Sequence, residues 1–291
     1  HSDTETLLAG IDFWGLKKTL NQTKGMFALS LWDKNEKKLF LARDRIGEKP
    51  LYYGWQGEGK TAAFLFGSEL KALRAHPSFQ SNINRDAICL LLRHNCIPAP
   101  YSIYQGISKL EPGSILSVSL DNLDPKISTY WSVIDIANRG IIDLHKGSDA
   151  KVLSELESLL KSSIGDQMVA DVSIGAFLSG GIDSSLIVAL MQQLSTDPVK
   201  TFTIGFSENG YNEAEYARAV ASHLKTDHTE LYLSPKETID VIHRLPQMYD
   251  EPFSDSSQIP TFLVSQLASQ NVTVSLSGDS GDELFCGYNR Y

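Results

Sequence analysis

The chain has 291 residues, of which 42% are hydrophobic and 21% charged. This composition excludes a disordered or collagen-like chain, and the length favours two folded domains over one. Acidic residues outnumber Lys and Arg by 35 to 26, for a formal net charge of -9, which argues against a broad nucleic-acid surface because phosphates require a basic one.

Two further features bear on location. The apolar stretches are shorter than the roughly 18 residues of a spanning helix, and residues 1–20 lack the basic and apolar regions of a secretion signal. The three cysteines, Cys89, Cys96 and Cys286, lack zinc-type spacing, so we expect reduced thiols. We therefore predict a cytoplasmic protein with neither a membrane nor a nucleic-acid partner.

The first third of the sequence predicts an antiparallel, β-rich layer followed by helices. Short apolar runs joined by polar or glycine-containing segments suit two successive hairpins. The apolar spacing then becomes helical before a further strand-like run. The predicted elements are strands at 26–32, 38–42, 51–55, 62–66 and 114–120, and helices at 69–75 and 85–93.

Residues 134–149 show little periodicity, and we place a linker there. Beyond the linker, strands alternate with helices, which predicts a parallel sheet with crossover helices. Ligands of such sheets bind at the carboxyl ends of the strands. The predicted helices are 152–164, 185–194, 213–223 and 260–269, and the predicted strands are 174–178, 199–206, 228–233 and 272–276.

The strongest chemical signal is Ser-Gly-Gly-Ile-Asp-Ser-Ser at 179–185, between a predicted strand and a helix. The glycines permit a tight turn, Ser184 and Ser185 can cap the helix, and a helix N-terminus favours a phosphate group. The motif lacks the lysine of the common phosphate-binding loop and the spacing of a dinucleotide fingerprint. An ordinary glycine-rich turn is the alternative, but Asp183 is better explained by Mg²⁺ bound together with a polyphosphate.

A second signal, Ser-Gly-Asp-Ser-Gly-Asp-Glu at 277–283, directly follows the last predicted strand. Alone it reads as an acidic surface turn. If its strand belongs to the parallel sheet, however, its three acidic residues lie on the same rim as Asp183. Such a cluster is costly without a cation, so the convergence of the two loops favours a binding site.

The first motif resembles the pyrophosphatase loop of N-type ATP pyrophosphatases, and 277–288 resembles the second motif of glutamine-hydrolysing asparagine synthetases. Segments 25–28, 42–52 and 67–73 are similar to that family's N-terminal-nucleophile glutaminase domain. The resemblance implies an α+β glutaminase sandwich at 1–133 without its N-terminal part, and the linker at 134–149. It further implies an α/β parallel-sheet ATP pyrophosphatase-type synthetase domain at 150–291 without its C-terminal part.

The same resemblance implies roles for individual residues. It assigns Mg²⁺ to Asp183 and Asp282, acceptor binding or catalysis to Asp279, and the glutamine α-amino group to Asp3. From the residues alone, Asp3 can equally be the acidic start of a helix before Leu7 and Leu8. Ser280 and Cys286 stand where the family usually has glycine. The implied ATP-binding positions are Ser179, Gly180, Gly181, Asp183, Ser184 and Ser185 at the phosphates, Ile204 at the adenine, and Ser277 and Gly278 at the nucleoside.

The implied function is ATP- and glutamine-dependent amidation of aspartate to asparagine through an acyl adenylate, with release of AMP and pyrophosphate. Its cofactors are ATP and Mg²⁺, and a homodimer is left open. One alternative is a same-family amidotransferase acting on a sugar carboxylate, a peptide or another acid. The other is an inactive nucleotide-binding relative. Because the family's N-terminal cysteine nucleophile is absent, we expect no glutamine hydrolysis by this chain alone.

Three weaker signals complete the analysis. The segment 250–257 resembles another rim loop near the ATP site. Residues 43–45, Arg-Asp-Arg, suggest a buried ion network that holds the glutaminase hairpin. The dispersed histidines His223, His228 and His243 suggest surface or capping positions rather than a metal site.

Overall fold

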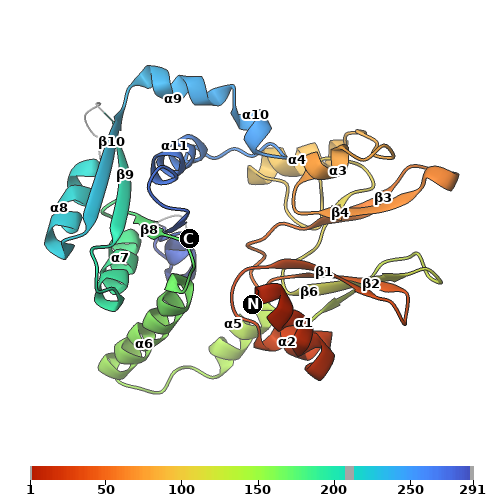
Figure 1. Cartoon of the computed structure of the whole chain (residues 1–291), viewed down its shortest axis with the longest axis horizontal. Helices are drawn as coiled ribbons and strands as arrows, with labels where there is room; N and C mark the ends of the chain where they lie inside the picture. Colours follow the sequence, from red (N-terminus) through yellow and green to blue (C-terminus); the bar gives the residue numbers. More distant parts are fainter. Residues whose placement is uncertain (1, 207–212, 289–291) are drawn as a thin grey trace. The chain divides into compact units, whose positions relative to one another are not determined.

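The structure is a computed structural model and describes residues 2–206 and 213–288. The chain forms two compact units (Figure 1). Unit 1 comprises His1–Leu144 together with Pro246–Ser254, and unit 2 comprises His145–Leu245 together with Asp255–Tyr291. A short segment from the second half of the sequence is therefore part of the first unit.

Unit 1 contains two antiparallel sheets rather than the single layer predicted. Both predicted hairpins are confirmed, since β1 pairs with β2 and β3 pairs with β4. One sheet has the order β1-β2-β6-β7 and the other β4-β3-β5 (Figure 1). The strands are β1 (Ala28–Asp33), β2 (Lys38–Arg43), β3 (Tyr52–Gln56), β4 (Ala63–Gly67), β5 (Ser108–Lys109), β6 (Ser114–Ser119) and β7 (Lys126–Thr129).

The alternation of side chains along β3 explains how these sheets are packed. Tyr53 lies in a core cluster with Leu41 of β2 and Leu116 of β6, so the two sheets share one apolar core. The neighbouring Tyr52 belongs to a different cluster, with Leu70 and other residues of the helical layer. Successive strand residues point to opposite faces, so β3 is covered on both.

The helices of unit 1 were only partly predicted. Helices α3 (Leu70–Arg74) and α4 (Arg85–His94) lie where apolar spacing placed them. The alternative reading of Asp3 as a helix start is confirmed, since α1 (Asp3–Trp14) begins there, whereas α2 (Leu16–Gln22) was not predicted. The sequence analysis also missed α5 (Val133–Ile142), which occupies most of the predicted linker and begins after a Ser132 side-chain cap.

Unit 2 contains the predicted parallel sheet, with the order β10-β9-β8-β11 and parallel pairing throughout (Figure 1). From β8, the sheet continues through β9 to β10 in chain order, whereas β11 pairs with the other edge of β8. The strand order therefore reverses at β8, which is where open α/β sheets usually bind ligands. The strands are β8 (Ile174–Phe177), β9 (Lys200–Phe206), β10 (Asp227–Leu233) and β11 (Val274–Leu276).

Helices cover both faces of this sheet. Ala176 of β8 lies in one core cluster with residues of three helices, α6, α7 and α8. Phe202 of β9 lies in another cluster, with Leu267 of α11 and with Phe177 packed against it. The helices of unit 2 include α6 (Asp149–Met168), α7 (Ile182–Leu194), α8 (Ala214–Leu224), α9 (Pro235–Ile242), α11 (Gln258–Ala268) and α12 (Gly281–Phe285), while α10 (Leu245–Met248) crosses into unit 1.

Candidate functional site

A concavity of about 380 Å³ lies at the carboxyl ends of β8 and β11 in unit 2. We call it the rim concavity. Because β8 and β11 are neighbours, the loops that follow them meet there, and the first turn of α11 completes the wall. The lining residues are Phe177, Ser179, Gly181, Ile182, Asp183, Ser184, Thr261, Ser277, Gly278, Asp279 and Asp282.

The two glycines of the first loop have different functions. Gly180 has a φ of +82°, and a Cβ atom there would lie 2.6 Å from the Ala217 amide nitrogen of α8. Gly180 therefore permits a left-handed turn and close packing on α8. Gly181 lines the rim concavity, and a Cβ atom there would have only Ser179 Oγ nearby, at 3.3 Å. The open space at Gly181 is available to a ligand.

Ser184 holds the first loop in shape. Its buried hydroxyl accepts a hydrogen bond from the Ser179 main-chain N–H at 3.2 Å and contacts Ser179 Oγ at 2.9 Å. The expectation that Ser184 and Ser185 cap the helix is wrong, because α7 begins after Gly181 without a side-chain cap. The first amides of α7 are thus not bonded to a capping side chain, as an anion site requires.

Glycines also let the second loop approach α7. A Cβ atom on Gly281 would lie 2.4 Å from Asp183 Cγ, and one on Gly278 would lie 2.7 Å from the Ser184 nitrogen. This close approach places Asp282 and Asp183 in one lining. The third acidic residue of the lining, Asp279, accepts a hydrogen bond from the Ser277 hydroxyl at 3.0 Å.

Ser280 and Cys286, where the sequence resemblance predicts glycine, adopt glycine-like conformations. Ser280 has a φ of 74° and Cys286 a φ of 59°, both in the left-handed region. Side chains are disfavoured there, so both residues carry a local conformational cost. Ser280 immediately precedes α12, and Cys286 follows it.

The donors in the rim concavity suit Mg²⁺ bound with a nucleotide. Within residues 2–206 and 213–288, no group of three or more His, Cys, Asp or Glu side chains is arranged to hold a metal ion. Mg²⁺ commonly uses only one or two carboxylates and takes its other ligands from phosphate oxygens and water. Asp183 and Asp282 fit this pattern, because they share the concavity with the open phosphate-type loop.

Several expected site residues lie elsewhere. Gly180 and Ser185 belong to the first loop and α7 but do not line the rim concavity, and the buried Ser185 hydroxyl has no hydrogen-bond partner. Ile204 lies on β9, two residues beyond Phe202, whose carbonyl accepts a hydrogen bond from Leu178. Asp3 begins α1 in unit 1, where its carboxylate accepts a hydrogen bond from the Thr4 N–H at 2.7 Å.

Thr261 is a lining residue that the sequence analysis missed. It lies in the first turn of α11, the helix that precedes β11. A helix that returns the chain to the start of a parallel strand begins at the carboxyl edge of the sheet. The predicted helix at 260–269 therefore carried a usable signal, since its first polar residue falls at that edge.

The segment 250–257, expected as a rim loop, is divided between the two units, and the expectation stays a prediction. Asp250 and Glu251 belong to the segment 246–254 of unit 1, and neither lines the rim concavity. Asp250 accepts hydrogen bonds from the main-chain N–H groups of Leu70 and Lys71. Glu251 forms a 2.5 Å ion pair with Lys109.

The structural role expected of residues 43–45 is confirmed for Arg43 and Asp44, but the predicted ion network is wrong in its partners, because the hydrogen bonds of these side chains go to the main chain. Asp44 is 1% exposed, and its carboxylate binds the turn that follows β2. Arg43 similarly donates to three main-chain carbonyls. Asp44 accepts from the N–H groups of Phe27, Gly47, Glu48 and Lys49, and Arg43 donates to the carbonyls of Gly47, Lys49 and Leu110.

His228 is half-buried on β10 and is neither a surface nor a capping histidine. Its Nδ1 lies 2.8 Å from the hydroxyl of the fully buried Thr201. Burial lowers the pKa of His228, an effect that the neighbouring Glu230 opposes. Glu230 itself forms a 2.5 Å ion pair with Arg218.

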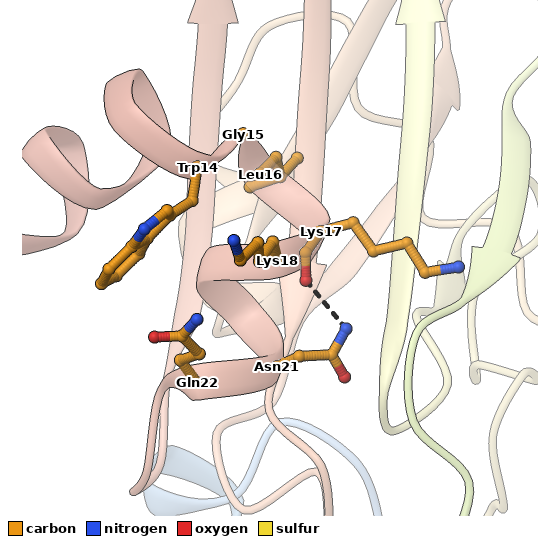
Figure 2. A pocket seen from close by; sticks show the side chains of 7 residues that line it. All are labelled: Trp14, Gly15, Leu16, Lys17, Lys18, Asn21 and Gln22. Carbon is orange, nitrogen blue, oxygen red and sulfur yellow. Dashed lines mark hydrogen bonds between the residues drawn. The ribbon is translucent and has the colours of Figure 1, made fainter.

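A second, open concavity of about 630 Å³ lies between α1 and α2 (Figure 2). Its lining contains no acid, histidine, cysteine or hydroxyl group. Figure 2 shows the Asn21 amide donating to the Lys17 carbonyl, at 2.9 Å, so this polar side chain serves its own helix. The rim concavity is therefore the better candidate for chemistry. The lining residues are Trp14, Gly15, Leu16, Lys17, Lys18, Asn21 and Gln22.

Comparison with known families agrees with this two-part organisation. Residues 1–131 match the glutamine amidotransferase domain family, and residues 155–291 match the asparagine synthase family. No helix in the described part of the chain has the length and apolar character needed to cross a membrane. Over nearly its whole length the chain is therefore similar to the glutamine-hydrolysing asparagine synthetases.

Individual relatives extend the match over the whole chain. A putative glutamine-hydrolysing asparagine synthetase 2 of Methanocaldococcus jannaschii is 38% identical over 99% of this chain and 54% of its own length. Asparagine synthetase 1 of Bacillus subtilis is 33% identical over 100% of this chain and 44% of its own length. The chain thus spans about half the length of these curated relatives.

One solved structure is similar in part. An ammonia-dependent NAD synthetase from Campylobacter jejuni shares 14% identity over 47% of this chain and 60% of its own, with a TM-score of 0.34. A similarity of that size does not define a common fold.

Proposed function

We propose that the chain is the core of a ligase that makes asparagine from aspartate, using ATP and the amide nitrogen of glutamine. The observation that carries this proposal is the convergence of the 179–185 and 277–283 loops on the rim concavity. The names of the relatives, which are glutamine-hydrolysing asparagine synthetases, support the same reaction. We retain 1–133 and 150–291 as the glutaminase and ATP pyrophosphatase-type synthetase domains.

The rim concavity would bind ATP through its first loop. The amides at the start of α7 and the open space at Gly181 suit the phosphates. Asp183 and Asp282 would hold Mg²⁺, which when bound neutralises charge on the departing pyrophosphate. Ser277 and Gly278 would contact the nucleoside, and Ile204 the adenine. Asp279 would bind the acceptor or assist its reaction.

The chemistry requires activation of the acceptor. Ammonia cannot displace oxide from a carboxylate, whereas AMP is a good leaving group. The aspartate β-carboxylate would therefore attack the α-phosphate of ATP, which gives the acyl adenylate and pyrophosphate. The helix N-terminus of α7 would stabilise charge that develops on the phosphates during this step. In unit 1, Asp3 would receive the α-amino group of glutamine.

Acceptor-dependent exchange of labelled pyrophosphate into ATP tests this proposal. The assay is best run on a protein that has the length of the curated relatives, with aspartate, sugar carboxylates and β-amino acids compared. We expect exchange with aspartate well above that with the other acids. Exchange that depends on another acid would contradict the proposed acceptor, and no exchange with any acid would contradict the reaction.

A further inference from the structure

The hydroxyl groups that line the rim concavity differ in what they already bind. They belong to Ser179, Ser184, Thr261 and Ser277. In the first loop, the Ser179 and Ser184 hydroxyls lie 2.9 Å apart, and Ser179 Oγ also accepts the Gly181 N–H at 3.3 Å. In the second loop, the Ser277 hydroxyl donates to the Asp279 carboxylate at 3.0 Å and accepts the Asp279 N–H at 3.4 Å. The three serine hydroxyls therefore hold their own loops in shape.

The Thr261 hydroxyl is different, because it has no hydrogen bond within the described residues, 2–206 and 213–288. A threonine in a helix often donates to the carbonyl four residues earlier, as Thr6, Thr19 and Thr238 do here. The Ser257 carbonyl instead accepts the main-chain N–H of Thr261, at 2.8 Å. The Thr261 hydroxyl is therefore free to bind a molecule that enters the concavity.

The first turn of α11 holds Thr261 at the wall of the concavity. Gln258, Ile259 and Pro260 are half-buried, and Leu263 is buried, whereas Thr261 is exposed. Thr261 is thus the residue of this stretch whose side chain is turned from the packed side toward the concavity. A side chain on a packed helix presents its polar atom more precisely than one on a loop.

The surroundings of Thr261 favour an anionic oxygen as its partner. Helix α11 has neither an acidic residue in its first turn nor a side-chain cap, and the N-terminus of a helix carries partial positive charge. Asp255, which precedes the helix, accepts the Ser257 N–H at 2.8 Å. The charged residues of the lining are all acids, and an ionised carboxylate offers an anion no donor. An anion bound here therefore depends on hydroxyl and main-chain donors.

We propose that Thr261 is a substrate-binding residue, whose hydroxyl donates a hydrogen bond to an anionic oxygen of a bound substrate. Two oxygens in the proposed reaction have this chemistry, a phosphate oxygen of ATP and the carboxylate of the acceptor. The inference rests on the proposed function for the identity of the ligand. The free hydroxyl and its place in the lining do not depend on that function.

The experiment separates the hydroxyl from the shape of the side chain. Thr261→Val removes the hydroxyl at nearly constant volume, whereas Thr261→Ser keeps it and removes the methyl group. Ser265→Ala is the matched control, because Ser265 is an exposed hydroxyl residue of the same helix that does not line the concavity. All three variants are made in a protein of the length of the curated relatives. Their urea midpoints should equal that of the wild type, because the Thr261 hydroxyl has no partner in the protein to lose.

Two measurements distinguish the two sources of the anionic oxygen. If the partner is a phosphate oxygen, Thr261→Val should bind Mg·ATP about tenfold more weakly in calorimetric titration. If the partner is the acceptor carboxylate, the affinity for Mg·ATP should stay the same, and the KM for the acceptor in pyrophosphate exchange should rise about tenfold. In both cases Thr261→Ser should stay within about threefold of the wild type, and Ser265→Ala should match it.

Wild-type values for both Mg·ATP affinity and acceptor KM in folded Thr261→Val would overturn the role of Thr261. An equal loss in Thr261→Ser would also overturn it, because the shape of the side chain and not the hydroxyl would then be responsible. If Thr261→Val does not fold, Thr261→Ala removes the same hydroxyl and is judged in the same way. A wild-type protein that binds no Mg·ATP would contradict the proposed function, whereas binding that Thr261→Val leaves unchanged together with the acceptor KM would contradict only the inference drawn here.

Discussion

Gly180 and Gly181 are adjacent, but the structure requires glycine at only one of them. Gly180 combines a positive φ with close contact to α8, whereas Gly181 faces open space. We expect Gly180→Ala to lower the free energy of unfolding by about 2 kcal/mol and Gly181→Ala to lower it by less than about 0.5 kcal/mol. Urea denaturation of the two variants measures both values. Equal losses of stability in the two variants would contradict the different surroundings of Gly180 and Gly181.

Asp183 and Asp282 provide a second test at the scale of residues. If they hold Mg²⁺ at the leaving pyrophosphate, Asp183→Asn and Asp282→Asn should lower the rate of pyrophosphate exchange by about a hundredfold or more while changing ATP affinity much less. Mg²⁺ would stabilise the negative charge that develops on the leaving pyrophosphate, so loss of a ligand should lower the exchange rate more than the ATP affinity. Exchange near the wild-type rate in both variants would remove the metal role.

The sequence predicted local elements well where periodicity was strong. Both hairpins and the βα alternation of unit 2 depend on contacts between near neighbours, which a sequence pattern records. It failed at α2. At α1 it gave only a helix start at Asp3 as an alternative, although Ser2 and Glu5 also have the spacing of a helix start and the Ser2 hydroxyl accepts the Glu5 N–H. It also failed at α5, whose apolar residues are exposed and not part of the buried core.

The turn after β2 depends on one buried carboxylate. Asp44 accepts four main-chain hydrogen bonds, and amide replacement would remove its charge and place an NH₂ donor against N–H groups. We expect Asp44→Asn to lower the free energy of unfolding by about 2 kcal/mol. Chemical denaturation followed by tryptophan fluorescence measures this cost. A loss below about 0.5 kcal/mol would mean that the turn holds without the charge.

The pairing of β9 and β10 should make stability sensitive to acid. Burial lowers the pKa of His228 from 6.5, so below that pH the unfolded state takes up a proton that the folded state resists. The contribution of His228 is fully present above its unfolded pKa and is lost as the pH falls below it. Denaturation at about pH 7.5 and 5.5 should therefore show a smaller acid loss in His228→Asn than in wild type. An equal loss would contradict burial of the neutral ring.

At the scale of the whole molecule, the order of the two domains was predictable, but the crossing of segment 246–254 into unit 1 was not. The hydrogen bonds of Asp250 and Glu251 join residues 148 to 199 positions apart, and no local pattern records such pairs. Thr261 was missed for a similar reason. The two loops that line the same concavity were recognised by their sequence motifs, whereas Thr261 is not part of a motif. Family resemblance supplied roles for residues, whereas packing decided where those residues lie.

The central claim is that the rim concavity binds Mg·ATP through the 179–185 loop. Calorimetric titration of Mg·ATP into the chain and into Gly181→Val tests it most directly, with unfolding curves confirming that the variant is folded. A branched side chain at Gly181 would occupy the open space of the concavity without a clash in the protein core. We predict binding to the wild-type chain and none to Gly181→Val. Equal affinity for both proteins, or no binding to the wild-type chain, would contradict the account.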